Sequence, residues 1–191
     1  SSSAVNWASM FMGAGPELHG YTTWNSSTPD LPSKELSKDG IFPTIFQLLR
    51  EADPKAEIGT FYEWVGIKYL VDTLAVNKYQ GINYEKHPTE LCETAVKYIK
   101  EKKPALTLIA WDNPDHVGHK EGHDTPAYYH KLEEIDGYIG KVMNAVKEAG
   151  ILDETIFIIT SDHGGINKGH GGNAGDGDSV HHLGEKYQER A

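Results

Sequence analysis

The sequence lacks the features of several specialised protein classes. It has one cysteine, Cys92, in 191 residues, so no disulfide can form within the chain. No apolar run approaches the roughly 20 residues that a membrane-spanning helix needs. The opening residues, SSSAVNWASMF, carry no basic segment of the kind that begins a signal peptide. We therefore expect no internal disulfide and no membrane span in this chain.

Positive charge is also scarce. The chain has 18 Lys and Arg residues against 28 Asp and Glu residues, a formal net charge of −10. This balance disfavours nucleic acid as a partner, because nucleic-acid binding needs a basic face. An anionic substrate would be repelled unless cations were bound locally. We therefore hypothesise that any phosphate-handling site here is loaded with metal, an idea that a metal-free active preparation would refute.

What is present is typical of a single soluble globular domain. Hydrophobic residues make up 38% and charged residues 24% of the chain, which is long enough for a sizeable core. Helical periodicity predicts helices over residues 42–52, 89–103 (with Thr89 as its cap) and from Pro126 to Gly150. Strands are predicted over residues 56–64, 105–112 and 155–162, and a surface loop over residues 22–40. We expect residues 1–191 to form a single, incomplete domain. Within it, residues 173–191 are predicted to be an irregular tail.

The order of these elements predicts the fold class. The apolar runs ALTLIAWD (105–112) and TIFIITSD (155–162) are typical of strands buried on both faces, and a long helix separates them. This βαβ unit favours an α/β fold, with a layered helix–sheet–helix arrangement around a mostly parallel central sheet. Reactive residues in such sheets lie at the carboxyl ends of the strands. One run ends in Asp112 and the loop NPDHVGH, and the other ends in Asp162 and His163.

The polar residues after these strands have the chemistry of metal ligands. Asp115 and His119 are four residues apart on a predicted loop, and His170 follows the second strand within a glycine-rich segment. These three residues would give a zinc ion three protein ligands and an open position. Asp162 and His163 could hold a second ion. Taken separately, each pattern has a simpler interpretation. An Asp-x-x-x-His pair usually lies in a solvated loop without binding a metal, and an Asp-His-Gly after a strand can form a simple turn.

Four motifs in order resemble the alkaline phosphatase superfamily, and within it the type I phosphodiesterase/nucleotide pyrophosphatase group. They are SSSAVNWASMFMGAGPELHGY at the front, PDHVGH after one apolar strand, TSDHGG after the next, and GHGG beyond it. The resemblance implies that Ser3 is the nucleophile, with Ser2 as the alternative if the register slips by one. It implies that Asp115, His119 and His170 bind one zinc, and that Asp162 and His163 bind the other. Asn25 lies one place from a substrate-binding Asn of the group, and His123 is a possible substrate contact or support for a ligand.

The resemblance also implies a function. It is the hydrolysis of phosphate monoesters or diesters on two divalent metal ions, expected to be zinc, through a covalent phosphoseryl intermediate. The alternatives are a phosphotransferase or mutase on the same scaffold, and an inactive metal-binding fragment. Relatives commonly act outside the cytoplasm, so an extracytoplasmic location is implied. The group's first strand, which carries an Asp ligand, and its last strands have no counterpart in this sequence, so we expect a fragment that lacks the first and last strands.

Overall fold

A parallel three-stranded sheet forms the centre of the computed structural model, which describes residues 2–170. The strands are β1 (Ile58–Tyr62), β2 (Lys78–Gly81) and β3 (Leu106–Ala110), in the order β2-β1-β3. Thr60 of β1 lies opposite Tyr79 of β2 and Leu108 of β3, and both pairings are parallel. The predicted α/β class with a parallel sheet is confirmed.

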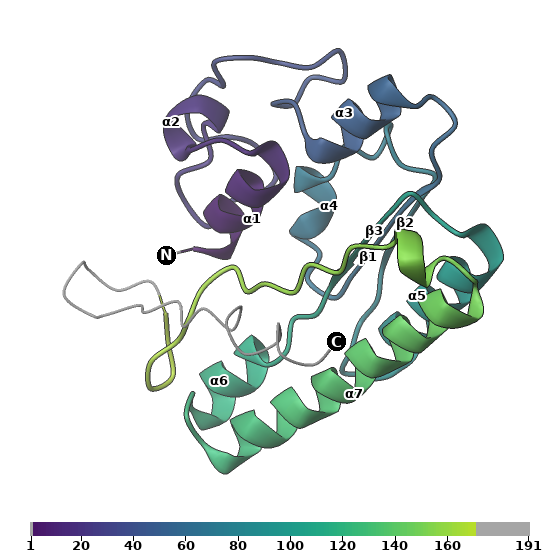
Figure 1. Cartoon of the computed structure of the whole chain (residues 1–191). Helices are drawn as coiled ribbons and strands as arrows, with labels where there is room; N and C mark the ends of the chain where they lie inside the picture. The colour runs from purple at the N-terminus through teal and green to yellow at the C-terminus, as the bar shows by residue number, and fades with distance from the viewer. Residues whose placement is uncertain (1, 171–191) are drawn as a thin grey trace.

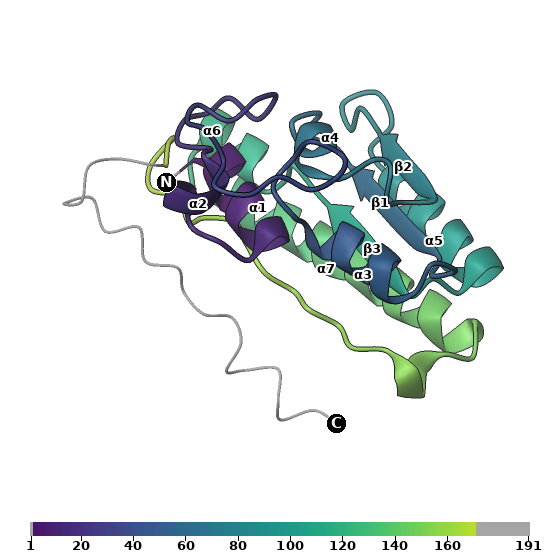
Figure 2. The ribbon, with the colours of Figure 1, turned by 90° about the horizontal axis from the view of Figure 1, so that it is seen from above.

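Helices cover both faces of this sheet (Figures 1 and 2). One layer contains α1 (Ser3–Met12), α2 (Pro16–His19), α3 (Ile45–Ala52) and α4 (Ile67–Leu70), and the other contains α5 (Glu90–Lys102) and α7 (Pro126–Glu148). Alternation along β1 explains the two layers, because successive side chains of a strand point to opposite faces. Ile58 and Tyr62 pack into the core with α1, α3 and α4, whereas Phe61 packs against α5. All five residues of β1 are buried as a result.

The helix boundaries follow the local signals with small differences. α3 begins after Thr44, whose hydroxyl accepts a hydrogen bond from the Gln47 amide. Thr125 caps α7 in the same way, and α7 ends at Glu148, two residues before Gly150. The predicted cap at Thr89 is wrong, because its side chain makes no capping hydrogen bond and its backbone is already in the right-handed helical region. The predicted loop at 22–40 contains no helix or strand, as expected.

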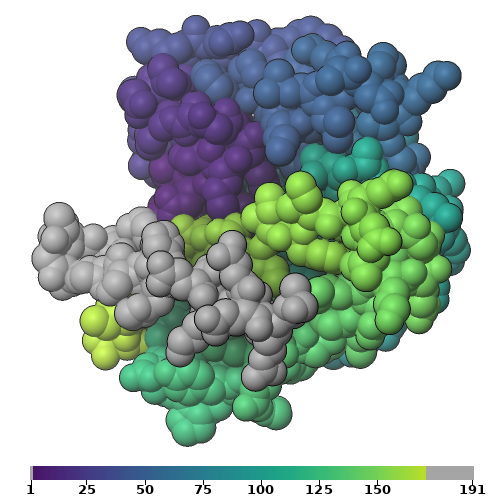
Figure 3. All heavy atoms as spheres, viewed as in Figure 1, coloured from purple at the N-terminus to yellow at the C-terminus, as the bar shows by residue number. Residues whose placement is uncertain are grey.

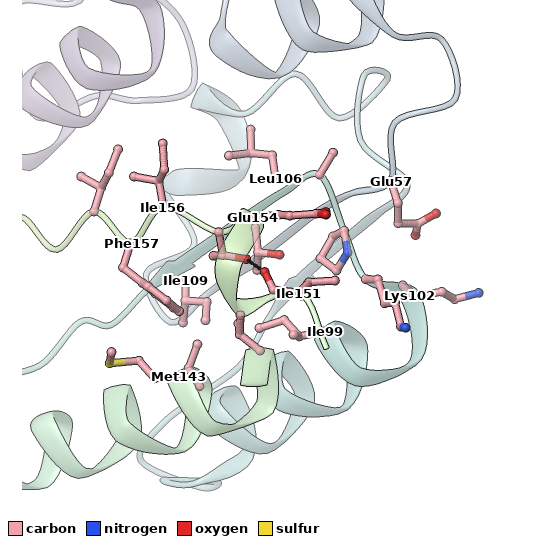
Figure 4. A pocket seen from close by; sticks show the side chains of 18 of the residues that line it. Glu57, Ile99, Lys102, Leu106, Ile109, Met143, Ile151, Glu154, Ile156 and Phe157 are labelled. Atoms are coloured by element: carbon pink, nitrogen blue, oxygen red, sulfur yellow. Dashed lines mark hydrogen bonds between the residues drawn. The ribbon is translucent and has the colours of Figure 1, made fainter. Parts of the chain in front are cut away.

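The predicted strand at 155–162 is not formed. Residues 155–161 are extended but pair with no strand in the described part of the chain, and Ile156 and Ile158 are 87% and 84% exposed. A cavity of about 860 Å³ separates this segment from β3, with Ile109, Met143 and Phe157 among the residues around it (Figure 4). An extended segment becomes a strand only when a neighbour supplies its hydrogen bonds, and β3 lies beyond this cavity. The same cavity leaves residues 106–109 of β3 half-buried, although burial on both faces was predicted.

One further segment differs from the sequence-based expectation. The predicted loop after β3 contains a short helix, α6 (Asp115–Glu121). From residue 151 the chain runs over the surface past the layer that contains α1, drawn yellow-green in Figure 3. The predicted irregular tail at 173–191 lies outside the described residues. Among residues 2–170, no helix combines the length and the apolar character needed to cross a bilayer.

Candidate active site

The start of α1 lies against the chain that follows residue 161. Ser3 is 8% exposed, and its Oγ lies 3.0 Å from Nε2 of His163. Asn6, one turn further along α1, donates a hydrogen bond of 2.8 Å from its side-chain amide to the carbonyl of Asp162. Ser2 points elsewhere, since its hydroxyl makes a long contact of 3.5 Å with the carbonyl of Thr23. Of the two candidate nucleophiles, the structure therefore brings Ser3 to the predicted ligand residues.

Helix α6 brings together the first set of predicted metal ligands. Residues four apart lie on the same face of a helix, and Oδ2 of Asp115 is 3.2 Å from Nε2 of His119. Nε2 of His170 lies 3.9 Å from the other carboxylate oxygen of Asp115. One ligand atom from each of the three residues lies within 4.8 Å of the others. The expected convergence of the three residues is present, on a helix rather than on a loop.

Backbone carbonyls of the chain after His163 orient the neighbouring imidazoles. Nδ1 of His119 is 3.0 Å from the Lys168 carbonyl, Nδ1 of His123 is 3.1 Å from the Asn167 carbonyl, and Nδ1 of His163 is 3.0 Å from the Gly164 carbonyl. A carbonyl oxygen only accepts hydrogen bonds, so each Nδ1 must carry the proton. In the neutral imidazole this leaves the lone pair on Nε2, which is the form that binds a metal.

These tautomers place lone pairs beside carboxylates. Nε2 of His119 and a carboxylate oxygen of Asp115 are both acceptors at 3.2 Å, so a cation or a proton between them would relieve their repulsion. The second oxygen, Oδ1 of Asp115, is buried and accepts no hydrogen bond from the described residues. A buried carboxylate oxygen without a partner is costly. The donor set of one carboxylate and two imidazoles fits zinc.

The second predicted set, Asp162 and His163, adjoins the first. Oδ2 of Asp162 lies 3.4 Å from Nε2 of His163, and the ring of His163 stacks on that of His170 with centroids 3.7 Å apart. Burial raises the pKa of Asp162, although the nearby His163 and a hydrogen bond with Ser3 offset part of that shift. Burial also raises the pKa of Asp112, and the charges of Asp115 and Asp162 add to the shift. A local cation would favour the ionised form of these crowded carboxyls.

A cavity of about 50 Å³ opens between these groups. Ser3, Asp112, Asp115, Asp162 and His163 line it together with aromatic side chains from four separate segments. The cavity lies at the carboxyl end of β3, where open parallel sheets place their ligands.

The two remaining predicted site residues differ in their placement. His123 is 9% exposed and its Nε2 lies 3.5 Å from Oδ1 of Asp115, so it adjoins a predicted ligand residue. Asn25 is exposed and does not line the cavity. Its side-chain oxygen accepts hydrogen bonds from Ser27, and its amide nitrogen donates to Thr28. The structure does not bring Asn25 to the cluster, because these bonds use its side chain to hold its own loop.

Sequence reasoning missed one acidic residue beside the site. Glu63 follows β1 directly, and its carboxylate accepts a 2.8 Å hydrogen bond from the Asp112 amide. Burial raises the pKa of Glu63 to about 7, and the charge of Asp112 adds to that effect. The strand predicted over residues 56–64 contained Glu63, but β1 ends at Tyr62, so Glu63 lies at the carboxyl end of the strand.

Known proteins are similar to this chain in sequence and in fold. The family model for type I phosphodiesterase/nucleotide pyrophosphatase matches residues 1–169. The chain belongs to this family. Rat ectonucleotide pyrophosphatase/phosphodiesterase family member 7 is 28% identical over 109 residues, which cover 54% of this chain and 25% of the relative. Human family member 5 is 34% identical over 102 residues, 53% of this chain and 21% of the relative.

Solved structures of the family share the fold. An inactive variant of murine ectonucleotide pyrophosphatase/phosphodiesterase 5 in complex with AMP superposes with a TM-score of 0.61 at 22% identity. The match covers 84% of this chain and 45% of that one. The chain therefore spans less than half the length of this family member and about a quarter or less of the two curated relatives.

Proposed function

We propose that this chain carries the nucleophile and metal ligands of a phosphodiester hydrolase. The family is one of nucleotide pyrophosphatases and phosphodiesterases, which supports phosphoric ester hydrolysis as the reaction class. The observation that carries the proposal is the position of Ser3, whose Oγ is 3.0 Å from His163 and lines one cavity with Asp115 and Asp162. A serine hydroxyl is a weak nucleophile unless a base or a cation activates it.

The residues divide into two sets in this proposal. Asp115, His119 and His170 hold one divalent cation, zinc by their donor chemistry, and Asp162 with His163 holds a second. When bound, such cations supply positive charge that lowers the pKa of a hydroxyl and offsets the charge of phosphoryl oxygens. His123 lies beside Asp115, and Asn6 donates a hydrogen bond to the backbone of Asp162.

The reaction proceeds in two displacements at phosphorus. Ser3 Oγ loses its proton and bonds to phosphorus, while the bond from phosphorus to the leaving oxygen breaks and that oxygen takes up a proton. Water then attacks the phosphoseryl group, which restores the serine hydroxyl and releases the phosphate product. Ser3 is the first residue of α1, so the positive end of this ten-residue helix faces the developing negative charge.

Paired serine variants test this assignment. Ser3→Ala should lower the hydrolysis of bis(p-nitrophenyl) phosphate at least about 1000-fold, because it removes the attacking atom. Ser2→Ala is the matched control and should keep nearly full activity, since its hydroxyl makes only the long contact with Thr23. Zinc content, measured by atomic emission, should be similar in both variants and the wild type.

Two results would contradict the proposal. Full activity in Ser3→Ala would remove Ser3 from the chemistry, and loss of activity in Ser2→Ala alone would move the nucleophile by one position. Adding methanol to the assay separates hydrolysis from transfer, because a phosphotransferase would form the methyl ester in place of the free phosphate product.

A further inference from the structure

Glu63 contacts the chain at the point where it leaves the sheet and leads to the first set of predicted ligands. The backbone amide of Glu63 donates a 3.0 Å hydrogen bond to the carbonyl of Ala110, the last residue of β3. Its carboxylate accepts a 2.8 Å hydrogen bond from the amide of Asp112. The backbone and the side chain of one residue therefore bind the chain on both sides of Trp111.

The same chain enters α6 within three residues of Asp112. The carbonyl of Asp112 accepts a 3.2 Å hydrogen bond from the amide of His116, which lies in the first turn of α6. Asp112 is thus held by Glu63 through its amide and by α6 through its carbonyl. A continuous series of hydrogen bonds connects the end of β1 to the helix that carries Asp115 and His119.

Glu63 does not itself reach the groups that would react. The cavity of about 50 Å³ is lined by Ser3, Asp112 and Asp162, among others, but not by Glu63. Burial raises the pKa of Glu63, and hydrogen bonds from the backbone of Asp112 and Asn113 offset part of that shift. A half-buried carboxylate that contacts backbone amides and lies outside the cavity acts on the position of the chain and not on a substrate.

The other end of β1 offers a comparison. Glu57 directly precedes β1, is half-buried like Glu63, and accepts a 2.6 Å hydrogen bond from the hydroxyl of Tyr98. Tyr98 belongs to α5, a helix that carries no predicted ligand. The two glutamates are therefore similar in exposure and differ in the segment that each side chain holds.

We infer that Glu63 is a positioning residue for the metal ligands of α6. Its carboxylate holds Asp112 and thereby fixes the start of the helix. Asp115 and His119 are then placed to meet His170. The inference rests on the proposed function, which assigns these three residues as zinc ligands. Removing a residue that orients a metal ligand typically lowers metal affinity by about 10–100-fold.

Three substitutions of Glu63 separate the role of its acceptor oxygen from that of its charge. Glu63→Gln keeps an acceptor oxygen on a side chain of the same length without the charge, Glu63→Asp keeps the charge on a shorter side chain, and Glu63→Ala removes both. The zinc dissociation constant is measured on the full chain by competition with a chromophoric chelator. We expect it to increase about tenfold or more in the Ala and Asp variants, and to stay within about threefold of the wild type in the Gln variant.

Glu57→Ala is the matched control and should leave the zinc dissociation constant unchanged, because its hydrogen bond holds α5. Hydrolysis of bis(p-nitrophenyl) phosphate gives a second readout. At saturating zinc, Glu63→Ala should regain most of the wild-type kcat with an unchanged KM, since the bound cation then holds the ligands together and Glu63 does not line the cavity. Ser3→Ala should not regain activity at any zinc concentration.

Several results would overturn the inference. They are an unchanged zinc dissociation constant in Glu63→Ala, an equal loss of affinity in Glu57→Ala, and a wild type that binds no zinc. Normal affinity in Glu63→Asp with weakened affinity in Glu63→Gln would assign the effect to charge and refute the positioning role, and this comparison decides the matter if Glu63→Ala does not fold. Zinc binding that depends on Glu63 without any turnover would refute the hydrolase and leave the positioning role standing.

Discussion

The ring of His123 lies between Gly118 and Gly165. This position predicts that the effect of Gly118→Ala on stability depends on whether the His123 ring is present. A Cβ atom added to Gly118 would lie 2.2, 2.5 and 2.6 Å from three atoms of the His123 ring. A Cβ atom added to Gly165 would meet the same ring, also at 2.2 Å. The ring cannot move aside easily, because it is buried and donates a hydrogen bond to the Asn167 carbonyl.

Gly118→Ala should therefore destabilise the wild type. Adding a methyl group to a filled space costs about 1–3 kcal/mol. Gly118 lies within α6, where alanine is otherwise the better helix former by up to about 1 kcal/mol. In a His123→Ala background the obstructing ring is gone, so the same substitution should be neutral or slightly stabilising. The difference is a coupling energy of about 1–3 kcal/mol between the two positions.

Urea unfolding of the wild type, both single variants and the double variant, at equal zinc concentration, measures this coupling. Gly137→Ala is the matched control, since it lies within α7 with nothing within 4 Å of the added Cβ atom, and it should stabilise by up to about 1 kcal/mol. If Gly118→Ala has the same effect with and without the His123 ring, the contact with this ring is not the reason for the glycine at position 118.

Two other predictions concern charge at the site. Burial raises the pKa of Glu63 from its usual 4.5 to about 7, so between these values the folded state keeps a proton that the unfolded state has lost. The free energy of unfolding should fall as the pH rises through this range. In urea unfolding at several pH values, Glu63→Gln should reduce this dependence on pH. An equal dependence in the wild type and the variant would contradict the prediction. Removing divalent cations with a chelator should lower the melting temperature of the wild type, because a cation that binds only the folded state stabilises it. Asp115→Asn should lose most of this shift, and an equal shift in both proteins would exclude Asp115 as a ligand.

The general fold was predictable because it depends on patterns that repeat along the chain. The apolar runs at 105–112 and 155–162, with the periodic helix between them, predicted the parallel α/β class from their order. The segment at 155–162 is apolar like β3 yet forms no strand, because strand formation depends on a partner edge that local sequence does not encode. Its exposed Ile156 and Ile158 show that apolar character predicts a preference for burial, and not the burial itself.

The convergence of Asp115, His119 and His170 was predictable from residue type and spacing. A spacing of four residues between Asp115 and His119 suits either a loop or one helical turn, and only the structure shows that it is a turn of α6. Asn25 was identified by its position in a motif, but its hydrogen bonds to Ser27 and Thr28 depend on local geometry that a motif does not contain. Glu63 was missed because the predicted strand extended to residue 64 and contained it, whereas β1 ends at Tyr62.

The orientation of the imidazoles could not be predicted, since it is set by backbone atoms and not by side chains. Three carbonyls, of Gly164, Asn167 and Lys168, accept the Nδ1 protons of His163, His123 and His119. Those histidines come from two different segments, so one short stretch of backbone fixes the tautomer of all three imidazoles. A carbonyl has the same chemistry whatever residue carries it. The backbone conformation of this stretch, and not its residue types, therefore directs the carbonyls toward the imidazoles. One position does limit the residue type, because Asn167 has a positive φ, a conformation that Asn tolerates better than most residues.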